Sequence, residues 1–211
     1  MKQQQVYRAL KWFQILVVSV LFSSCASLIA PNIKTDLVEL KEGQYELDPK
    51  HTAVLFKVNH MGFSKFIGRF EIVDASLDFD PENMANSRLE ATVDMASVNV
   101  NNESFADTLK GNDWFNVESF PQAVFRTTSV NYSRGSEVDF NGDLTFLGVT
   151  QPIVLTVLFN GGANNLLTGR YTIGFEAQTS FNRSDFGLDK YMGAVGDVIE
   201  LEVHAEFQRI R

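Results

Sequence analysis

The side chains of this sequence that could do chemistry are few and lie far apart along the chain. Its three histidines, His51, His60 and His204, have no partner at a His-x-His, His-x3-His or cysteine spacing of the kind that metal sites use. No glycine-rich phosphate loop opens a helix, and no Cys-x-x-Cys-His motif would attach haem. The sequence therefore predicts no metal site and no cofactor.

Two aspartates beside an arginine are the candidates for acid–base chemistry. Asp185 and Asp189 follow Arg183, and paired carboxylates could support hydrolysis. No nucleophile stands at a matching spacing and Gly-x-Ser-x-Gly is absent, so we expect both aspartates to form turns. We expect Arg183 to pair with Asp185 or to face an anionic head group. The sequence names no catalytic residue and favours a protein that is not an enzyme; a lipid hydrolase using His60, Asp185 and Asp189 is the alternative.

The first 24 residues have the layout of a signal peptide. Lys2, Arg8 and Lys11 precede an uncharged apolar run over residues 12–22. This run is well short of the roughly 20 residues that a transmembrane helix needs. Residues 1–24 are therefore predicted to be a leader that directs export and is removed.

The only cysteine, Cys25, directly follows Ser23 and Ser24. This arrangement resembles a bacterial lipobox, which implies cleavage before Cys25 and a diacylglyceryl group on its sulfur. The alternative is ordinary signal cleavage that leaves a free thiol, a reactive group in an oxidising compartment. We expect a lipoprotein of the cell envelope or periplasm, and Ala26, in place of an acidic residue, favours the outer membrane.

Charge limits the partners of the mature chain. Removing the leader takes away three cations and no anion, so the net charge changes from −8 to −11. Nucleic acid is thereby an unsuitable partner, and the membrane would be reached through the acyl anchor. Residues 25–42 lack a sustained period and are predicted to be a tether, while residues 43–211 suit one domain.

Period-two alternation dominates from Gly43 onward and predicts an all-β domain. The clearest case is 199–207, where five apolar residues alternate with Glu200, Glu202, His204 and Glu206. Gly161-Gly162 is predicted to be a turn. About nine strands are expected, around Tyr45, from Thr52, and over 70–79, 89–95, 123–132, 137–146, 153–159, 171–181 and 199–207.

One stretch is predicted to be a helix, from Asn102 to Lys110. Phe105 and Leu109 lie four residues apart on one face, and Gly111 ends the pattern. Trp114 and two phenylalanines follow closely. This aromatic segment is suited to covering one end of a β-structure.

Strands with one apolar face must either stack as two sheets or close into a barrel. The chain has eighteen phenylalanines, nearly all after the leader, which favours an antiparallel barrel wide enough to hold an apolar ligand. A sandwich with a solid, phenylalanine-packed interior is the alternative, and it would bind a partner rather than a ligand.

Four segments resemble the YceI-like family and occur in that family's order. They are 45–70 (Tyr45-Glu46-Leu47-Asp48, then His51-Thr52-Ala53-Val54), 109–121 (Leu109-Lys110-Gly111-Asn112-Asp113-Trp114-Phe115), 142–152 (Gly142-Asp143-Leu144-Thr145-Phe146) and 182–187 (Asn182-Arg183-Ser184-Asp185-Phe186-Gly187). The resemblance implies an extended lipocalin-like barrel of eight to nine strands with one short helix near an end. It also implies an interior that binds polyisoprenoids or related long-chain lipids and amides, and no catalytic residue.

Alternation selects the side chains expected to line such an interior. The predicted lining is apolar and comprises Val54, Phe56, Val58, Phe70, Leu89, Val93, Phe105, Leu109, Phe125, Leu144, Phe146, Phe175 and Phe181. His60 continues the face of Phe56 and Val58, so it could meet a ligand head group, as could Arg183. The sequence leaves the choice between a monomer and a homodimer open.

Overall fold

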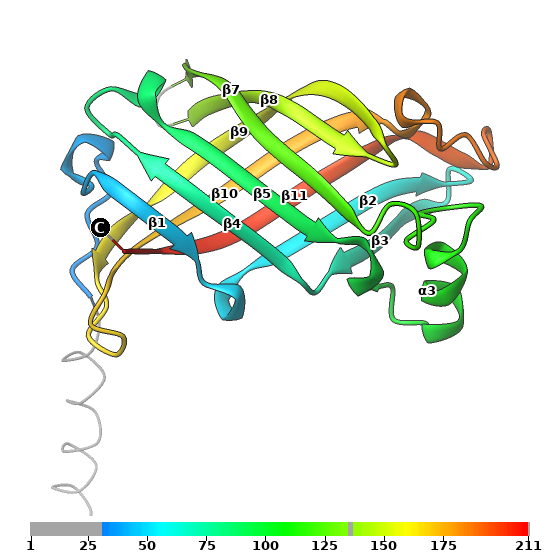
Figure 1. Ribbon diagram of the computed structural model, residues 1–211, viewed down its shortest axis with the longest axis horizontal. Helices are drawn as coiled ribbons and strands as arrows, with labels where there is room; N and C mark the ends of the chain where they lie inside the picture. The colour runs from blue at the N-terminus through cyan, green and yellow to red at the C-terminus, as the bar shows by residue number, and fades with distance from the viewer. Residues whose placement is uncertain (1–30, 135–136, 211) are drawn as a thin grey trace, which may run out of the picture.

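The computed structural model describes residues 31–134 and 137–210, which form one closed antiparallel barrel. The predicted leader and Cys25 lie outside the described residues. Eleven strands make one sheet, and pairing of β1 with β11 closes a ring in the order β1-β4-β5-β7-β8-β9-β10-β11 (Figure 1). The strands are β1 (Gly43–Leu47), β2 (Ala53–His60), β3 (Ser64–Phe70), β4 (Val73–Phe79), β5 (Arg88–Asp94), β6 (Val98–Asn99), β7 (Gln122–Arg134), β8 (Glu137–Phe146), β9 (Val149–Asn164), β10 (Tyr171–Asn182) and β11 (Val195–Arg209).

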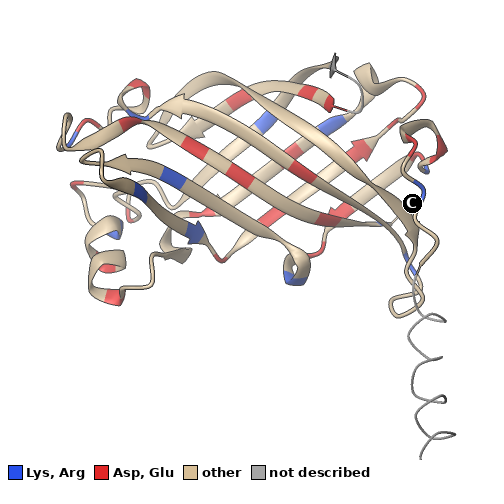
Figure 2. Ribbon diagram, turned by 180° about the vertical axis from the view of Figure 1, so that it is seen from behind, with Lys and Arg blue, Asp and Glu red and all other residues tan. Residues whose placement is uncertain are grey.

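The long strand β11 organises the closure. One edge of β11 pairs with β10 along 172–182, while its other edge pairs first with β2 and then with β1. The sheet therefore continues past the ring at one end through β2, β3 and β6. Charged residues recur along the strands (Figure 2). On β11 the charged residues Glu200, Glu202 and Glu206 alternate with the inward apolar side chains, as the predicted alternation requires. The predicted all-β barrel is confirmed.

The predicted helix is also confirmed. Helix α3 (Glu103–Lys110) is the only α-helix in the described part of the chain. The side chain of Asn102 caps it by accepting a hydrogen bond from Phe105 N at 3.0 Å, and it ends at Gly111. Short 3₁₀ turns complete the structure, at Leu37–Glu39, Pro49–His51, Met84–Asn86, Met95–Ser97 and Arg183–Phe186. No helix within the described residues is both long and apolar enough to cross a membrane.

Two sequence predictions about strands are wrong. The single strand expected over 70–79 is the end of β3 and all of β4, separated at Glu71 and Ile72, whose backbone N–H groups donate to Ser97 Oγ. Gly161-Gly162 is not a turn but lies inside β9. A Cβ on Gly161 would lie 2.5 Å from the carbonyl oxygen of Lys34, so this glycine lets residue 34 pair with Gly162.

The two ends of the barrel are packed differently. At the end where β1 begins and the chain finishes, buried aromatic and aliphatic side chains pack across the interior, among them Tyr45, Phe79, Phe140, Phe159 and Ile173. We call this the solid end. Leu40 belongs to this core and Lys34 pairs with Gly162, so the described part of the predicted 25–42 tether contacts the solid end.

Candidate ligand-binding site

The other half of the barrel encloses a cavity of about 710 Å³ with almost wholly apolar walls. Burial along β11 shows where the packing stops. Phe207 and Ala205 are buried, whereas the next inward side chains, Val203, Leu201 and Ile199, are only half-buried although they face the interior. The part of the barrel interior that these three side chains face is therefore unfilled.

The cavity opens at the end that carries α3. The exposed residues of its wall, His60, Tyr191 and Ala194, all lie at this end. The amide of Met61 donates to the carbonyl of Ala194 at 2.7 Å, which ties the β2–β3 turn to the loop before β11. The ring of Trp114 lies 6.0 Å from that of Tyr191 and completes the border. We call this opening the mouth.

Aromatic rings form the floor and much of the wall. Phe175 and Phe207 stack with their centroids 5.1 Å apart where the solid end begins. Phe56 lies across Gly68 of the neighbouring strand, and a Cβ at Gly68 would collide with the Phe56 ring. The small residue on β3 therefore sets the position of a large residue on β2.

The segment around α3 closes the side of the barrel that the strands leave open. Phe105 of α3 packs edge-on against Phe66 of β3, with their centroids 5.6 Å apart. Phe115 lies about 6.0 Å from both Phe70 of β3 and Phe146 of β8. These contacts join two parts of the sheet that do not pair with each other and complete the cavity wall.

Every residue predicted to line the interior lies on this wall. The thirteen apolar candidates, from Val54 to Phe181, and the two polar ones, His60 and Arg183, all border the cavity. Sequence reasoning missed Phe66, Ile153, Leu201 and several neighbours. Phe66 was missed because β3 was not recognised, whereas Ile153 and Leu201 lay in expected strands on the same face as named candidates.

The YceI-like domain family matches residues 45–207, nearly the whole barrel. Protein YceI of Escherichia coli O157:H7 is 32% identical over 186 residues, which cover 88% of this chain and 91% of that protein. The chain belongs to the YceI-like family. The resemblance noted in the sequence is thus confirmed over the full domain.

Solved structures agree with this assignment. The Campylobacter jejuni YCEI protein is 28% identical and aligns with a TM-score of 0.65 over 72% of this chain and 90% of that one. A polyisoprenoid binding domain from Saccharophagus degradans, at 13% identity, aligns with a TM-score of 0.58 over 80% of this chain and 99% of that one. The second match supports the fold alone.

In this YceI-like barrel Arg183 is held by backbone carbonyls and not by a carboxylate. Its side chain is 1% exposed, and its guanidinium donates to the carbonyls of Gly196, Leu188 and Val195 at 2.7–3.1 Å. The predicted pairing with Asp185 is wrong, because Asp185 accepts from Asn182 instead and no ion pair of Arg183 occurs within the described residues. Arg183 therefore fastens the loop that leads to the mouth.

Asp185 and Asp189 are not arranged for hydrolysis. Asp185 lies in the 3₁₀ turn Arg183–Phe186, and its backbone carbonyl accepts from Gln151. The carbonyl of Asp189 accepts from Met192 N at 3.3 Å, within the loop before β11. Both residues therefore serve the local turns, as the sequence predicted, and neither lines the cavity.

The other two histidines lie outside the cavity. His51 Nδ1 is 3.0 Å from Asp48 Oδ2 and 3.9 Å from Glu206 Oε2, a grouping that links η2 (Pro49–His51) to β11. The hydrogen bond with His51 lowers the pKa of Asp48, and the same bond raises the pKa of His51. Asp48 also accepts from Lys50 N and Gln208, so its oxygens are occupied by donors. His204 contacts Glu202 on the outer face.

Proposed function

We propose that this protein binds and carries one long-chain apolar molecule, a polyisoprenoid, fatty acid or fatty amide, inside its barrel. The observation that carries the proposal is the unfilled cavity of about 710 Å³, bordered by side chains of Val, Leu, Ile, Phe and Ala. Cavities of this size and character are typical of ligand sites. The name of the Saccharophagus degradans neighbour supports a polyisoprenoid within this class.

Apolar walls alone supply enough free energy for useful affinity. Each buried methylene contributes about 0.8 kcal/mol, so a tail of about 15 carbons gains roughly 12 kcal/mol. Association costs about 4 kcal/mol or more, which leaves a Kd near micromolar or weaker. The wall therefore needs no specific polar contact to hold the tail.

The head group would remain at the mouth. His60 is exposed there and borders the cavity, while Arg183 is buried beneath the adjoining loop. A tail directed toward the floor at Phe175 and Phe207 leaves the polar end of the ligand near His60. The site thus selects for a long tail first and for a hydrogen-bonding head group second.

Export and anchoring form the second part of the proposal. The leader over residues 1–24 and the lipobox-like Cys25 support an acylated protein of the envelope or periplasm, held in the outer membrane. Mass spectrometry of the protein extracted from membranes tests this part. A diacylglyceryl group on Cys25 is expected, and an unmodified thiol or an uncleaved leader would contradict it.

Native mass spectrometry tests the binding proposal directly. The full chain is mixed separately with a polyisoprenol, oleic acid and oleamide, and hexanoic acid serves as the short control. One molecule of a long-chain compound should bind, and hexanoic acid should not, because the free energy grows with buried length. Protein that stays unliganded with all three long-chain compounds would refute the proposal.

A further inference from the structure

The mouth of the cavity is bordered by two turns that carry exposed apolar side chains and no charged residue. These turns, Asn59–Ser64 and Tyr191–Ala194, form the structure we call the rim. Phe63 is 85% exposed, and Met61, Tyr191 and Met192 are each about half exposed or more. A chain with 21% charged residues would be expected to place charge on such exposed turns. The rim is thus unusual for a surface that faces only water.

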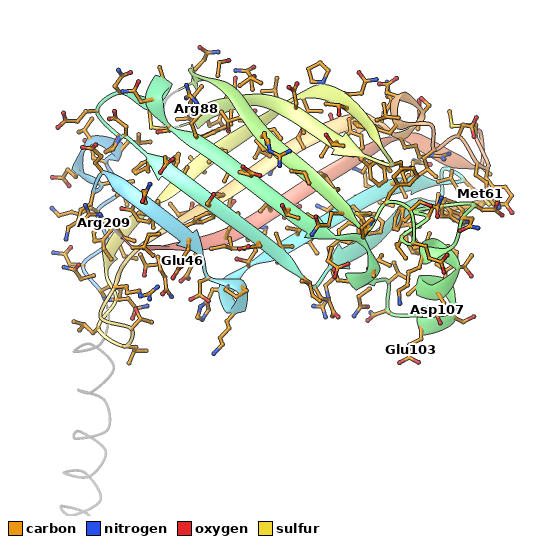
Figure 3. All side chains as sticks on the ribbon, viewed as in Figure 1. Glu46, Met61, Arg88, Glu103, Asp107 and Arg209 are labelled. Atoms are coloured by element: carbon orange, nitrogen blue, oxygen red, sulfur yellow. The ribbon has the colours of Figure 1, made fainter. Side chains whose placement is uncertain are left out.

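The backbone holds these side chains outward. Met61 and Gly62 both have positive φ, and Gly62 N donates to Asn59 Oδ1 at 2.8 Å. Phe63 N donates to the carbonyl of His60 at 3.0 Å. Figure 3 shows Met61 at the extreme end of the molecule, beyond α3 and opposite Arg209. The rim is therefore a formed projection.

The two cations that flank the rim are each paired with a carboxylate, and Asp189, two residues before the rim, carries a negative charge. Lys190, which directly precedes the rim, forms an ion pair with Asp113. Lys65, which directly follows it, forms an ion pair with Glu200. With these cations paired and a chain that carries a net charge of −8, attraction to an anionic surface would be weak. Contact made by this projection would be driven by apolar burial.

We infer that the rim docks on a lipid bilayer, so that the mouth opens toward the hydrocarbon and the ligand enters or leaves along a continuous apolar path. This inference rests on the proposed function, since a lipid ligand is what such docking would exchange. Tyr191 and Ala194 belong both to the rim and to the cavity wall, so the rim is continuous with the cavity. Trp114 and Tyr191 add the aromatic rings that favour the membrane–water interface.

The available area favours a bilayer over a protein partner. Four large apolar side chains of at most about 200 Å² each, exposed to the extent stated above, offer roughly 500 Å². A stable protein interface needs about 800 Å² from each partner. Reversible binding to a bilayer has no such minimum area, because its strength scales with the apolar area buried in the membrane.

Fluorescence of Trp114 provides the test, because this tryptophan lies at the mouth. The full chain carries Trp12→Phe throughout, which leaves Trp114 as its single tryptophan. Net-neutral, zwitterionic phosphatidylcholine vesicles with brominated acyl chains should quench Trp114, and added salt should not reduce the quenching. Removing the phenyl ring with Phe63→Ser should weaken this docking about tenfold or more.

Leu167→Ser is the matched control. Leu167 is 82% exposed, a fraction similar to the 85% of Phe63. It lies in the β9–β10 turn at the solid end, far from the mouth. Its substitution should leave Trp114 quenching unchanged. Quenching of Trp114 requires brominated chains close to this residue, so it reports contact at the mouth.

Three results would overturn the inference: no quenching of Trp114, equal loss of quenching in the Phe63 and Leu167 variants, or a dimer in light scattering that Phe63→Ser dissociates. The last result would make the rim an interface between copies. Failure of the proposed function is distinguishable, because equilibrium binding of oleic acid in detergent-free solution should be the same in Phe63→Ser and in the parent chain. Absent oleic acid binding in both would count against the carrier role and not against docking.

Discussion

Filling the cavity from its wall should abolish binding without harming the fold. Ala91 lies on β5 with its side chain toward the cavity, between Ala75 of β4 and Phe125 of β7, and it is only half-buried. Ala91→Phe places a benzyl group in space that we assign to the ligand tail. Displacing about five methylenes costs roughly 4 kcal/mol, which raises the Kd about a thousandfold.

The assay is a fluorescence titration with cis-parinaric acid, a long-chain fatty acid that brightens in apolar surroundings. Ala91→Leu adds half as many carbons and should give an intermediate loss, about thirtyfold. The unfolding temperature should stay the same or rise, because the added carbons occupy an unfilled apolar space.

Ala53→Phe is the matched control for this series. Ala53 lies on β2 next to the inward Val54, so its side chain points to the outer face. Its Kd for cis-parinaric acid should equal that of the parent chain. Undiminished binding by a folded Ala91→Phe variant would show that the ligand does not occupy the cavity and would refute the reasoning.

Three further predictions concern stability and protonation. Phe140→Ala, in the solid end, should lower the free energy of unfolding, measured in urea, by about 3–5 kcal/mol. Phe66→Ala, on the cavity wall, should lower it by less than half as much. Equal losses in the two variants would contradict the claim that the half of the barrel near the mouth is hollow. Arg183→Met should cost about 3 kcal/mol or more in the same assay, because three carbonyls lose their donor, and Arg183→Lys should not restore it, since lysine lacks the planar fork. Asp48→Asn should lower the pKa of His51 toward its ordinary 6.5 in an NMR titration, because the hydrogen bond that raises this pKa is weakened. The stabilisation from this pair should be largest between the ordinary pKa values of the two groups, 3.8 for Asp48 and 6.5 for His51. It should be lost as pH falls from 3.8 through the lowered pKa of Asp48, or rises from 6.5 through the raised pKa of His51; an unshifted His51 titration in the variant would contradict it.

Alternation in the sequence was enough to predict which side chains face the interior. In a strand the side-chain period is two, so one inward residue determines the rest of the strand. The same pattern could not show where the interior is filled. Phe140 and Phe146 lie on the same face of β8, yet Phe140 belongs to the solid end and Phe146 borders the cavity. The surroundings of Phe140 and Phe146 differ because of the way the sheet closes, which depends on contacts between residues far apart in the sequence.

The missed strand β3 left a signal that could have been used. Inward positions on β3 are Phe66, Gly68 and Phe70, whereas those on β4 begin at Val73, so the alternation shifts by one residue across Glu71 and Ile72. Such a shift marks the end of a strand. The partners of Arg183 left no signal in the sequence, because they are backbone carbonyls whose position follows from the loop conformation.

A crystal structure grown with a long-chain fatty acid that carries bromine at its tail end would test the central claim most directly. We predict an anomalous bromine peak inside the barrel, near the stacked rings of Phe175 and Phe207, with the carboxylate at the mouth near His60. An interior without a bromine peak, or peaks confined to the outer surface, would contradict the claim that the hollow half of this barrel holds the ligand.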